Sequence, residues 1–570
     1  MMPDQYQHRH SALSCRGRRL YGPSPREGGD RRAAAFKPLA ASLVLLPSPL
    51  HGYGLSTILS SLPADSIVVA VELEPALNLL SLDSQESLLP ALLTAYPKQL
   101  RYLHAPNSQR LFRDICEELP SHLRRVQLLS LNNGYSLHAQ TYRALQQDIE
   151  DELARIWRNR ATTLALGPLW VRNLFRNLPL LTVSPRLSTA APERGTTAER
   201  GSPPVIVVGA GASLESDIEI IRDLRSEVTL VAADSAFMPL QGHGITPDLV
   251  VVLEAQPVNR EHFLLPLETL CKTKQGLPRT AFDLSSLPTL ARRFHTSGGA
   301  PFITRFASIS LFDRIEQHGL VPATVAPVGS VGVCAIMLTT ALFGGPIAIT
   351  GFDSAYSGGL PHTRGAASHR WALRRSNRLD QEPLFSFLHS RRPIAVAGKG
   401  DRSYMSEPTL LGSAERIGEL LDSYPRLFDF GSTGLNLGRT VDSTRTAVRA
   451  ALNLDAKTTE EREPDSPTTK KHAQPHHRGA TIVEAPLRTE LLRTFVEAEI
   501  ALLDAGITEL SELERGGLES TPSNTLSQLE YLYFDVSTTT PTSSAGRRRA
   551  LLQAYRCREL LAQSRSELSE

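Results

Sequence analysis

The chain has 570 residues, of which 41% are hydrophobic and 21% are charged, and its mean hydropathy is −0.16. This composition is typical of a globular protein with enough apolar residues for more than one hydrophobic core. Lysine and arginine together (61) nearly balance aspartate and glutamate (59), so the net charge of +2 argues against a chain that as a whole binds nucleic acid or an anionic membrane.

The cysteines and the apolar runs indicate where the protein acts. The five cysteines are widely spaced and form no CxxC or Cys/His pair, which favours a reducing, cytoplasmic compartment and predicts no metal site. No apolar run reaches the roughly 20 residues that a membrane-spanning helix needs. Residues 1–35 are rich in arginine and lack the apolar core of a signal peptide, so we expect a disordered basic head.

The next region, residues 36–186, has the outline of a nucleotide-binding unit. Residues 41–47 form a buried-strand pattern, and residues 51–59 read as a glycine turn that leads into a helix. A second strand pattern, residues 66–71, ends at Glu72. Strand, glycine loop, helix, strand and acid follow one another in nucleotide-binding βαβ units. We therefore predict an N-terminal Rossmann-like α/β domain.

The remaining chain divides by composition. Residues 187–204 are small, polar and rich in proline, which is typical of a linker. Residues 205–440 contain short apolar runs without alternation, separated by helical patterns, which indicates a parallel sheet covered on both faces. Residues 455–480 have the composition of a disordered linker, and residues 485–570 carry helical apolar spacing. The predicted fold is two Rossmann-like parallel-sheet domains followed by a C-terminal α-helical region.

A glycine loop opens the second domain. Residues 209–214 read Gly-Ala-Gly-Ala-Ser-Leu and lie between a strand pattern and a helical one. Gly209 and Gly211 allow backbone N–H groups to approach a phosphate, and the helix start adds partial positive charge. Ser213 is placed to cap that helix or to bind a phosphate oxygen. A tight turn between strand and helix, with no ligand, explains the same pattern.

Acidic residues follow the next two strands. Asp234 and Ser235 come after the second strand pattern, and Glu254 comes after the third. The carboxyl ends of parallel strands form the ligand crevice of an open α/β sheet. Acids at that edge bind ribose hydroxyls or a divalent cation that bridges phosphates.

Further polar residues follow the later elements. Gly329 and Ser330 precede a helical run, which offers a second helix N-terminus to an anion. Asp353 ends another buried strand, and His362 and Arg364 lie in a glycine-flanked loop beyond it. Histidine and arginine there suit general acid–base catalysis and phosphate neutralisation, although a loop histidine is often only a surface residue.

These motifs, in this order over about residues 203–365, resemble those of the motility-associated-factor (Maf) proteins, whose central domain is called 6-hydroxymethylpterin diphosphokinase MptE-like. The resemblance extends more loosely to the N-terminal glycine-loop domain. Maf proteins are implicated in glycosylating flagellin with nonulosonic (sialic-acid-like) sugars from CMP-activated donors. Their central domain is similar to bacterial sialyltransferases, which hold the nucleotide on a Gly-x-Gly-Pro-Ser-Leu loop and use a histidine base.

The resemblance implies roles for particular residues. Gly209, Gly211 and Ser213 match the sialyltransferase loop, with Ala212 in place of the usual proline, and His362 is the candidate base. A second branch of the resemblance is the archaeal pterin enzyme, which transfers diphosphate from ATP with magnesium. Its relatives, the thiamine pyrophosphokinases, carry a cluster of acids where this chain has only Glu254, so the metal cluster looks incomplete.

We therefore expect a cytoplasmic glycosyltransferase that moves a nonulosonic sugar from a CMP-sugar donor to Ser or Thr of flagellin or another secreted protein. Its predicted catalytic base is His362. The residues predicted to bind the nucleotide and its phosphate are Gly209, Gly211, Ser213, Asp234, Ser235, Glu254, Gly329, Ser330, Asp353 and Arg364. Two alternatives remain open: a diphosphokinase that uses ATP and magnesium, and a non-catalytic accessory protein that binds flagellin.

Overall fold

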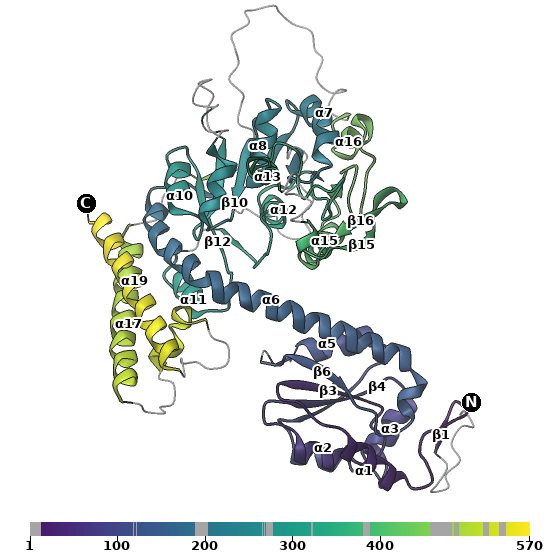
Figure 1. Cartoon of the computed structure of the whole chain (residues 1–570). Helices are drawn as coiled ribbons and strands as arrows, with labels where there is room; N and C mark the ends of the chain where they lie inside the picture. The colour runs from purple at the N-terminus through teal and green to yellow at the C-terminus, as the bar shows by residue number, and fades with distance from the viewer. Residues whose placement is uncertain are drawn as a thin grey trace, which may run out of the picture. The chain divides into compact units, whose positions relative to one another are not determined.

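The computed structural model of the chain divides into two compact units (Figure 1). The first comprises Met1–Ala165 with Asp535–Thr539, and the second comprises Leu166–Phe534 with Thr540–Glu570. The structure describes residues 13–117, 119–120, 122–187, 203–264, 266, 268, 278–320, 323–379, 388–455, 482–483, 489–516, 524–534 and 543–569.

The first unit is built on a four-stranded parallel sheet in the order β5-β4-β3-β6. Its strands are β3 (Ser42–Pro47), β4 (Ile67–Glu72), β5 (Leu100–His104) and β6 (Arg125–Leu128). Its helices are α1 (Pro25–Ala35), α2 (Leu55–Ser61), α3 (Pro75–Asp83), α4 (Leu89–Ala95), α5 (Ser108–Glu117) and the first part of α6 (Ala139–Asn177).

Helices cover both faces of this sheet. Leu43 and Leu45 of β3 pack with α5 and α6, whereas Val44 and Leu46 of the same strand pack with α1, α2 and α4 (Figure 1). Successive side chains of a strand point to opposite faces, so a strand buried on both faces must be apolar throughout. The continuous apolar runs of β3 and β4 have this cause.

The predicted disordered head is wrong for residues 13–35. They form the short pair β1 (Ser14–Cys15) and β2 (Arg18–Arg19), followed by α1. Helix α1 docks through Gly29, where a Cβ would lie 2.5 Å from the carbonyl oxygen of Tyr53. The high arginine content of this segment predicted disorder, because composition counts every residue equally. Packing uses only one side of a helix, so the small packing face of α1 was missed. Residues 1–12 lie outside the described residues.

Helix α6 extends over 39 residues and belongs to both units, which divide after Ala165. The contacts of residues 166–187 therefore group them with the second unit, unlike the predicted boundary at residue 186. Most of the predicted linker, residues 188–202, lies outside the described residues. So does most of the second predicted linker, residues 456–480.

The second unit contains an eight-stranded sheet, parallel throughout, in the order β13-β12-β11-β10-β9-β8-β14-β17. The strands are β8 (Val205–Val208), β9 (Thr229–Ala233), β10 (Leu249–Val252), β11 (Arg279–Asp283), β12 (Ala300–Thr304), β13 (Ala323–Val325), β14 (Ile347–Thr350) and β17 (Leu427–Asp429). The chain runs outward from β8 to β13 and then returns to β14 on the other side of β8. The strand order therefore reverses between β8 and β14, and ligands bind at such a switch point in open α/β sheets.

Both faces of the large sheet are also covered. Helices α12 (Val331–Leu342) and α15 (Pro408–Ser423) pack on one face. The other face is covered by α7 (Leu214–Leu224), α8 (Asp234–Gly242), α10 (Pro288–His295) and α16 (Arg445–Ala451). A hairpin of β15 (Ile394–Ala397) and β16 (Ser403–Ser406) precedes α15.

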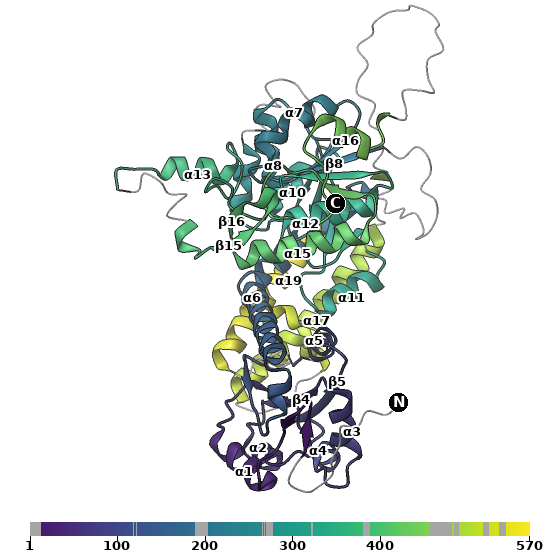
Figure 2. The same ribbon diagram turned by 90° about the vertical axis from the view of Figure 1, so that its right-hand side faces the viewer.

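The C-terminal helices belong to the core of the second unit. Helices α17 (Thr489–Gly516) and α19 (Ser544–Glu567) lie side by side and share a hydrophobic cluster with the end of α6 and with α11 (Ser310–Gln317) (Figures 1 and 2). Arg314 of α11 forms a buried ion pair with Glu499 of α17, with a closest N–O distance of 2.8 Å.

The predicted fold class is confirmed: two Rossmann-like units with parallel sheets are followed by an α-helical C-terminal region. Among the helices that the structure describes, none combines the length and apolar character needed to span a membrane.

Candidate functional site

The loops after β8 and β14 meet at the switch point of the large sheet. A Cβ on Gly209 would lie 2.3 Å from the Gly351 carbonyl oxygen, and one on Gly211 would lie 2.4 Å from Oδ1 of Asp353. The N–H of Gly211 donates to the Gly351 carbonyl at 2.7 Å. Glycine is therefore required here because the two loops approach more closely than a side chain permits.

Asp353 fixes this arrangement. Its carboxylate accepts hydrogen bonds from the N–H of Ser213 at 2.9 Å, from the Ser213 hydroxyl, from Ser357 Oγ at 3.2 Å and from Thr433 Oγ1 at 3.0 Å. Asp353 and Ser213 are both buried. Because both donors of Ser213 are occupied, Ser213 and Asp353 position the glycine loop in this structure. A phosphate would have to be bound by other groups than these two predicted ligands.

A buried lysine lies beside the same loops. Lys399, which follows β15, places Nζ 2.6 Å from Oδ2 of Asp429 at the end of β17, and their side chains are only 14% and 2% exposed. A Cβ on Gly431 would lie 3.3 Å from this Nζ and 3.4 Å from Ser213 Oγ. Burial raises the pKa of Asp429, and the positive charge of Lys399 opposes that rise. Sequence reasoning missed this pair, because no local pattern marks a hairpin lysine that contacts a distant strand.

Two of the predicted acids come together as expected. Asp234 is the first residue of α8 and is buried, and Glu254, just after β10, is half-buried. Burial, assisted by the negative charge of Glu254, raises the pKa of Asp234 to about 7. Hydrogen bonds from the Ser235 backbone and the Asn259 side chain to Asp234 favour its ionised form.

Under the diphosphokinase alternative, the carboxylates of Asp234 and Glu254 would hold the magnesium ion. Magnesium is commonly bound by one or two carboxylates together with water and substrate phosphates, so the pair fits such an ion in number. Within the described part of the chain, no group of three His, Cys, Asp or Glu side chains is placed to hold a metal ion.

His362 lies in the loop after β14. This loop docks on the glycine loop through the N–H of Thr363, which donates to the carbonyl of Ala210 at 2.8 Å. Nδ1 of His362 is 3.0 Å from the hydroxyl of Ser368, in the first turn of α13 (Ala367–Arg375). Burial lowers the pKa of His362, so its ring is neutral near pH 7.

Sequence reasoning also missed Asn259 and His262, which lie on the 3-10 helix η3 (Pro257–His262) after β10. Burial, together with the charge of nearby His362, lowers the pKa of His262 to about 4. Oδ1 of Asn259 and Nδ1 of His262 are buried and have no hydrogen-bond partner among the residues that the structure describes. Their position soon after Glu254, at the carboxyl end of β10, was the available signal.

Helix α12 begins near the same edge of the sheet. The Oγ of Ser330 caps it by accepting from the N–H of Gly332 at 3.2 Å, and Gly329 is exposed. A Cβ on Gly332 would lie 2.7 Å from the ring of Phe352, so the positive end of α12 adjoins the loop after β14. This end is the best-placed helix terminus for an anion at the switch point.

Arg364 is less well placed than predicted. Its side chain is 72% exposed and pairs with Glu215 at 3.4 Å, while its backbone N–H donates to the same carboxylate at 2.8 Å. It would have to leave Glu215 to neutralise a phosphate.

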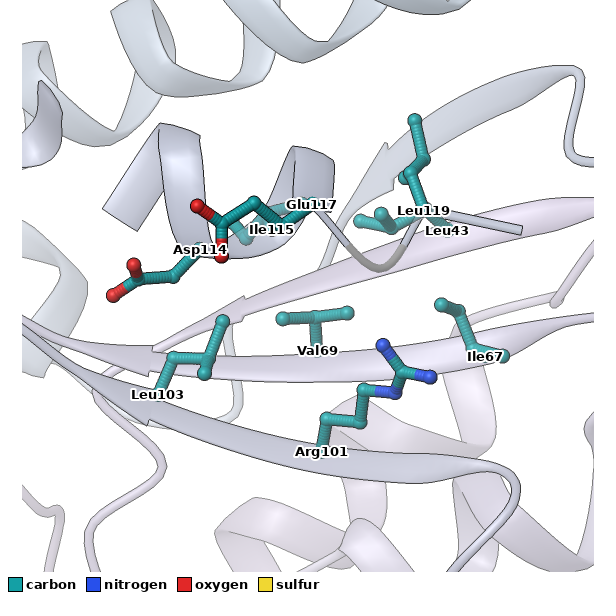
Figure 3. A pocket seen from close by; sticks show the side chains of 9 residues that line it. All are labelled: Leu43, Ile67, Val69, Arg101, Leu103, Asp114, Ile115, Glu117 and Leu119. Carbon is teal, nitrogen blue, oxygen red and sulfur yellow. The ribbon is translucent and has the colours of Figure 1, made fainter. Parts of the chain in front are cut away.

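A cavity of the first unit has a largely apolar lining. Figure 3 shows this cavity between α5 and the strands β3, β4 and β5, and its volume is about 220 Å³. Its lining is Leu43, Ile67, Val69, Arg101, Leu103, Asp114, Ile115, Glu117 and Leu119. Ile67 is the first residue of β4, so the cavity reaches toward the amino end of that strand, whereas Glu72 lies at the carboxyl end.

Comparisons with known proteins bear on the second unit above all. Residues 172–359 match the family model described as 6-hydroxymethylpterin diphosphokinase MptE-like. The match includes the glycine loop, Asp234, Glu254 and Asp353, and it ends just before His362 and Arg364.

Other known proteins are similar to this chain. An uncharacterized protein of Treponema pallidum (strain Nichols) is 26% identical over 429 residues, covering 72% of this chain and 68% of its own. A second uncharacterized protein of that organism is 35% identical over 94 residues, covering 16% of this chain and 40% of its own. The solved structure of a Maf glycosyltransferase from Magnetospirillum magneticum AMB-1 has a TM-score of 0.56 and 15% identity, covering 97% of this chain and 86% of that one. The shared fold and the MptE-like match support the predicted resemblance to Maf proteins.

Proposed function

We propose that the chain is a cytoplasmic glycosyltransferase that transfers a nonulosonic sugar from a CMP-activated donor to a Ser or Thr hydroxyl of flagellin or another secreted protein. The observation that carries this proposal is His362, a neutral imidazole held by Ser368 on a loop docked against the glycine loop. The MptE-like match and the fold shared with a Maf glycosyltransferase support sugar transfer as the reaction class.

His362 is the general base in this proposal. In the tautomer whose Nδ1–H donates to Ser368 Oγ, Nε2 is the acceptor, because a neutral imidazole carries one proton. Nε2 takes the proton of the acceptor hydroxyl as that oxygen forms a bond to the anomeric carbon of the sugar. The bond from the anomeric carbon to the donor phosphate oxygen breaks, and CMP leaves with the electron pair.

The switch point supplies the donor site. The N-terminus of α12, capped by Ser330 and preceded by Gly329, faces the negative donor phosphate. In this proposal Asp234 and Glu254 accept hydrogen bonds from ribose hydroxyls, and Ser235 follows Asp234 in the first turn of α8. Gly209 and Gly211 allow close approach to the loop that Ser213 and Asp353 hold in place.

The decisive variant is His362→Ala. We expect turnover of a CMP-sugar to fall about 10²–10⁴-fold, the usual contribution of a general base, while the affinity for CMP stays within about twofold. His243→Ala, at an exposed helix end of the same unit, is the matched control and should change neither quantity. Equal turnover in His362→Ala and wild type would refute the assignment.

The diphosphokinase alternative rests on the Asp234–Glu254 pair. It predicts that ATP with magnesium, and not CMP, raises the melting temperature, and that Glu254→Gln removes the effect. A ligand at 100 times its Kd should stabilise the protein by about 2.7 kcal/mol, so a thermal-shift series with CMP and ATP, each with and without magnesium, separates the two enzymes. No shift and no turnover would favour the non-catalytic accessory protein.

A further inference from the structure

Two buried polar atoms on the 3-10 helix η3 lack hydrogen-bond partners among the residues that the structure describes. They are Oδ1 of Asn259, whose side chain is fully buried, and Nδ1 of His262. A buried polar atom without a hydrogen bond destabilises a fold, so such atoms are rare in native proteins. Two of them on one short helix, within the described part of the chain, indicate that a bound molecule supplies the missing partners.

Hydrogen bonds hold the side chain of Asn259, and the residue after His262 packs in an aromatic cluster. The amide nitrogen of Asn259 is 3.5 Å from the carbonyl oxygen of Glu254, and the same side chain hydrogen-bonds Asp234. These contacts use the amide as a donor and leave Oδ1 as the free acceptor. Phe263, next to His262, packs against Phe237 and Phe294 at ring-centroid distances of 5.6 and 5.0 Å. The site is thus built on packed groups.

The position of the pair relative to His362 indicates which part of the donor it would meet. The ring of His262 is close enough to His362 for the charge of one to lower the pKa of the other. The base must lie within hydrogen-bond reach of the hydroxyl that attacks the anomeric carbon. Groups near the base are therefore expected near the sugar, whereas the cytosine lies beyond the phosphate.

We propose that Asn259 and His262 form the subsite that recognises the sugar of the donor. Oδ1 of Asn259 accepts a hydrogen bond from an N–H or hydroxyl of the sugar, and Nδ1 of His262 forms one with a second polar substituent, such as an acyl-amide group. This subsite rests on the proposed function and specifies which side chains select the sugar.

The test compares two probes, CMP and CMP-N-acetylneuraminic acid, by calorimetric titration of the full chain. Wild type should bind the CMP-sugar about 100-fold more tightly than CMP, about tenfold for each of the two hydrogen bonds. His262→Phe, which keeps an aromatic ring without nitrogen, should reduce that preference about tenfold and leave the Kd for CMP unchanged. His262→Asn, which places an amide nitrogen near the Nδ1 position, should restore part of it. Asn259→Ser should behave like His262→Phe.

Three other results would overturn the subsite. In the first, the sugar preference stays undiminished in His262→Phe or in Asn259→Ser, and the proposed function stands. Equal losses of affinity for CMP and the CMP-sugar, with a lowered Tm, would assign the pair a structural role and also overturn the subsite. If wild type binds neither probe, the proposed function itself fails, and the subsite fails with it.

Discussion

The two parallel sheets of this protein share a plan and differ in the groups that gather at the switch point. In each, the strand order reverses beside the first strand of the sheet, at β3–β6 and at β8–β14. In each, the second strand leads directly to a buried acid, Glu72 or Asp234, and burial raises the pKa of both to about 7. A Rossmann-like order with an acid after its second strand therefore does not identify the active unit by itself.

The difference lies in the neighbours of the acid. One oxygen of Glu72 accepts from the hydroxyl of Ser48 and from the backbone N–H groups of Leu73 and Glu74, at 3.3, 3.0 and 2.9 Å. His51 of the same unit stacks on Tyr21 at 5.7 Å within an aromatic cluster. Asp234 instead lies near two partly exposed imidazoles and an amide with a free acceptor. Neutral imidazoles transfer protons, which is why the chemistry is assigned to the second unit.

The largest expected contrast concerns ion pairs. Glu499→Gln leaves Arg314, only 15% exposed, without its buried counter-charge, and should destabilise the second unit by about 3–5 kcal/mol. Glu74→Gln breaks the pair with Arg16, which is 58% exposed, and should change the stability of the first unit by less than about 1 kcal/mol. Urea unfolding followed by circular dichroism measures both. Similar losses would mean that burial does not distinguish the two pairs.

A second contrast concerns the two buried acids and pH. Each has a folded-state pKa near 7, above its ordinary value of 3.8 or 4.5, so the folded state holds the proton more tightly. The stability that this proton contributes is fully present below the ordinary value and is lost as pH rises through 7. Asp234→Asn and Glu72→Gln remove the buried charge.

Between pH 5 and 8, both neutral variants should therefore gain about 2–3 kcal/mol of stability relative to wild type. Denaturant titrations at pH 5, 6.5 and 8 measure this gain. A gain that is independent of pH in either variant would contradict a raised pKa for that acid. The buried acids of the two sheets would then differ in pKa.

The glycine loops should respond differently to alanine. In Gly211→Ala the new Cβ would meet Asp353 Oδ1 at 2.4 Å, and such overpacking destabilises by about 2–3 kcal/mol. Gly52 has φ of +75° and its nearest neighbour is 3.5 Å from a Cβ, so Gly52→Ala should cost about 1–2 kcal/mol from backbone strain alone. Only Gly211→Ala should also weaken CMP binding, which titration of both variants would reveal.

The smallest contrast is at two helix starts. Ser330→Ala removes the hydroxyl that caps α12 and should lower stability by about 1 kcal/mol. Ser24→Ala is the control, because Ser24 precedes α1 without a side-chain capping bond, and it should stay within about 0.5 kcal/mol of wild type. The melting temperatures of the two variants, compared with wild type, measure both stability changes. An equal shift in both would contradict the assigned cap.

Elements with a strong local pattern could be predicted. The strand at 205–208, the helix that starts at Val331 and the acid at Asp234 were all found from apolar runs and their ends. The C-terminal helices were found from their spacing, although not their place in the core of the second unit. Residues 13–35 were misjudged because charge content concealed a packing face.

The sequence by itself determined the class of fold, because burial on both faces makes each strand an unbroken apolar run whose carboxyl end can be located. It therefore placed Gly209, Asp234 and Glu254 at one edge of one sheet. Only the tertiary structure decided that Ser213 hydrogen-bonds Asp353, 140 residues away, and that the charge of His362 influences the pKa of His262. The physical reason is that loops have no periodicity, and their side chains find partners across distances in sequence that no local pattern records.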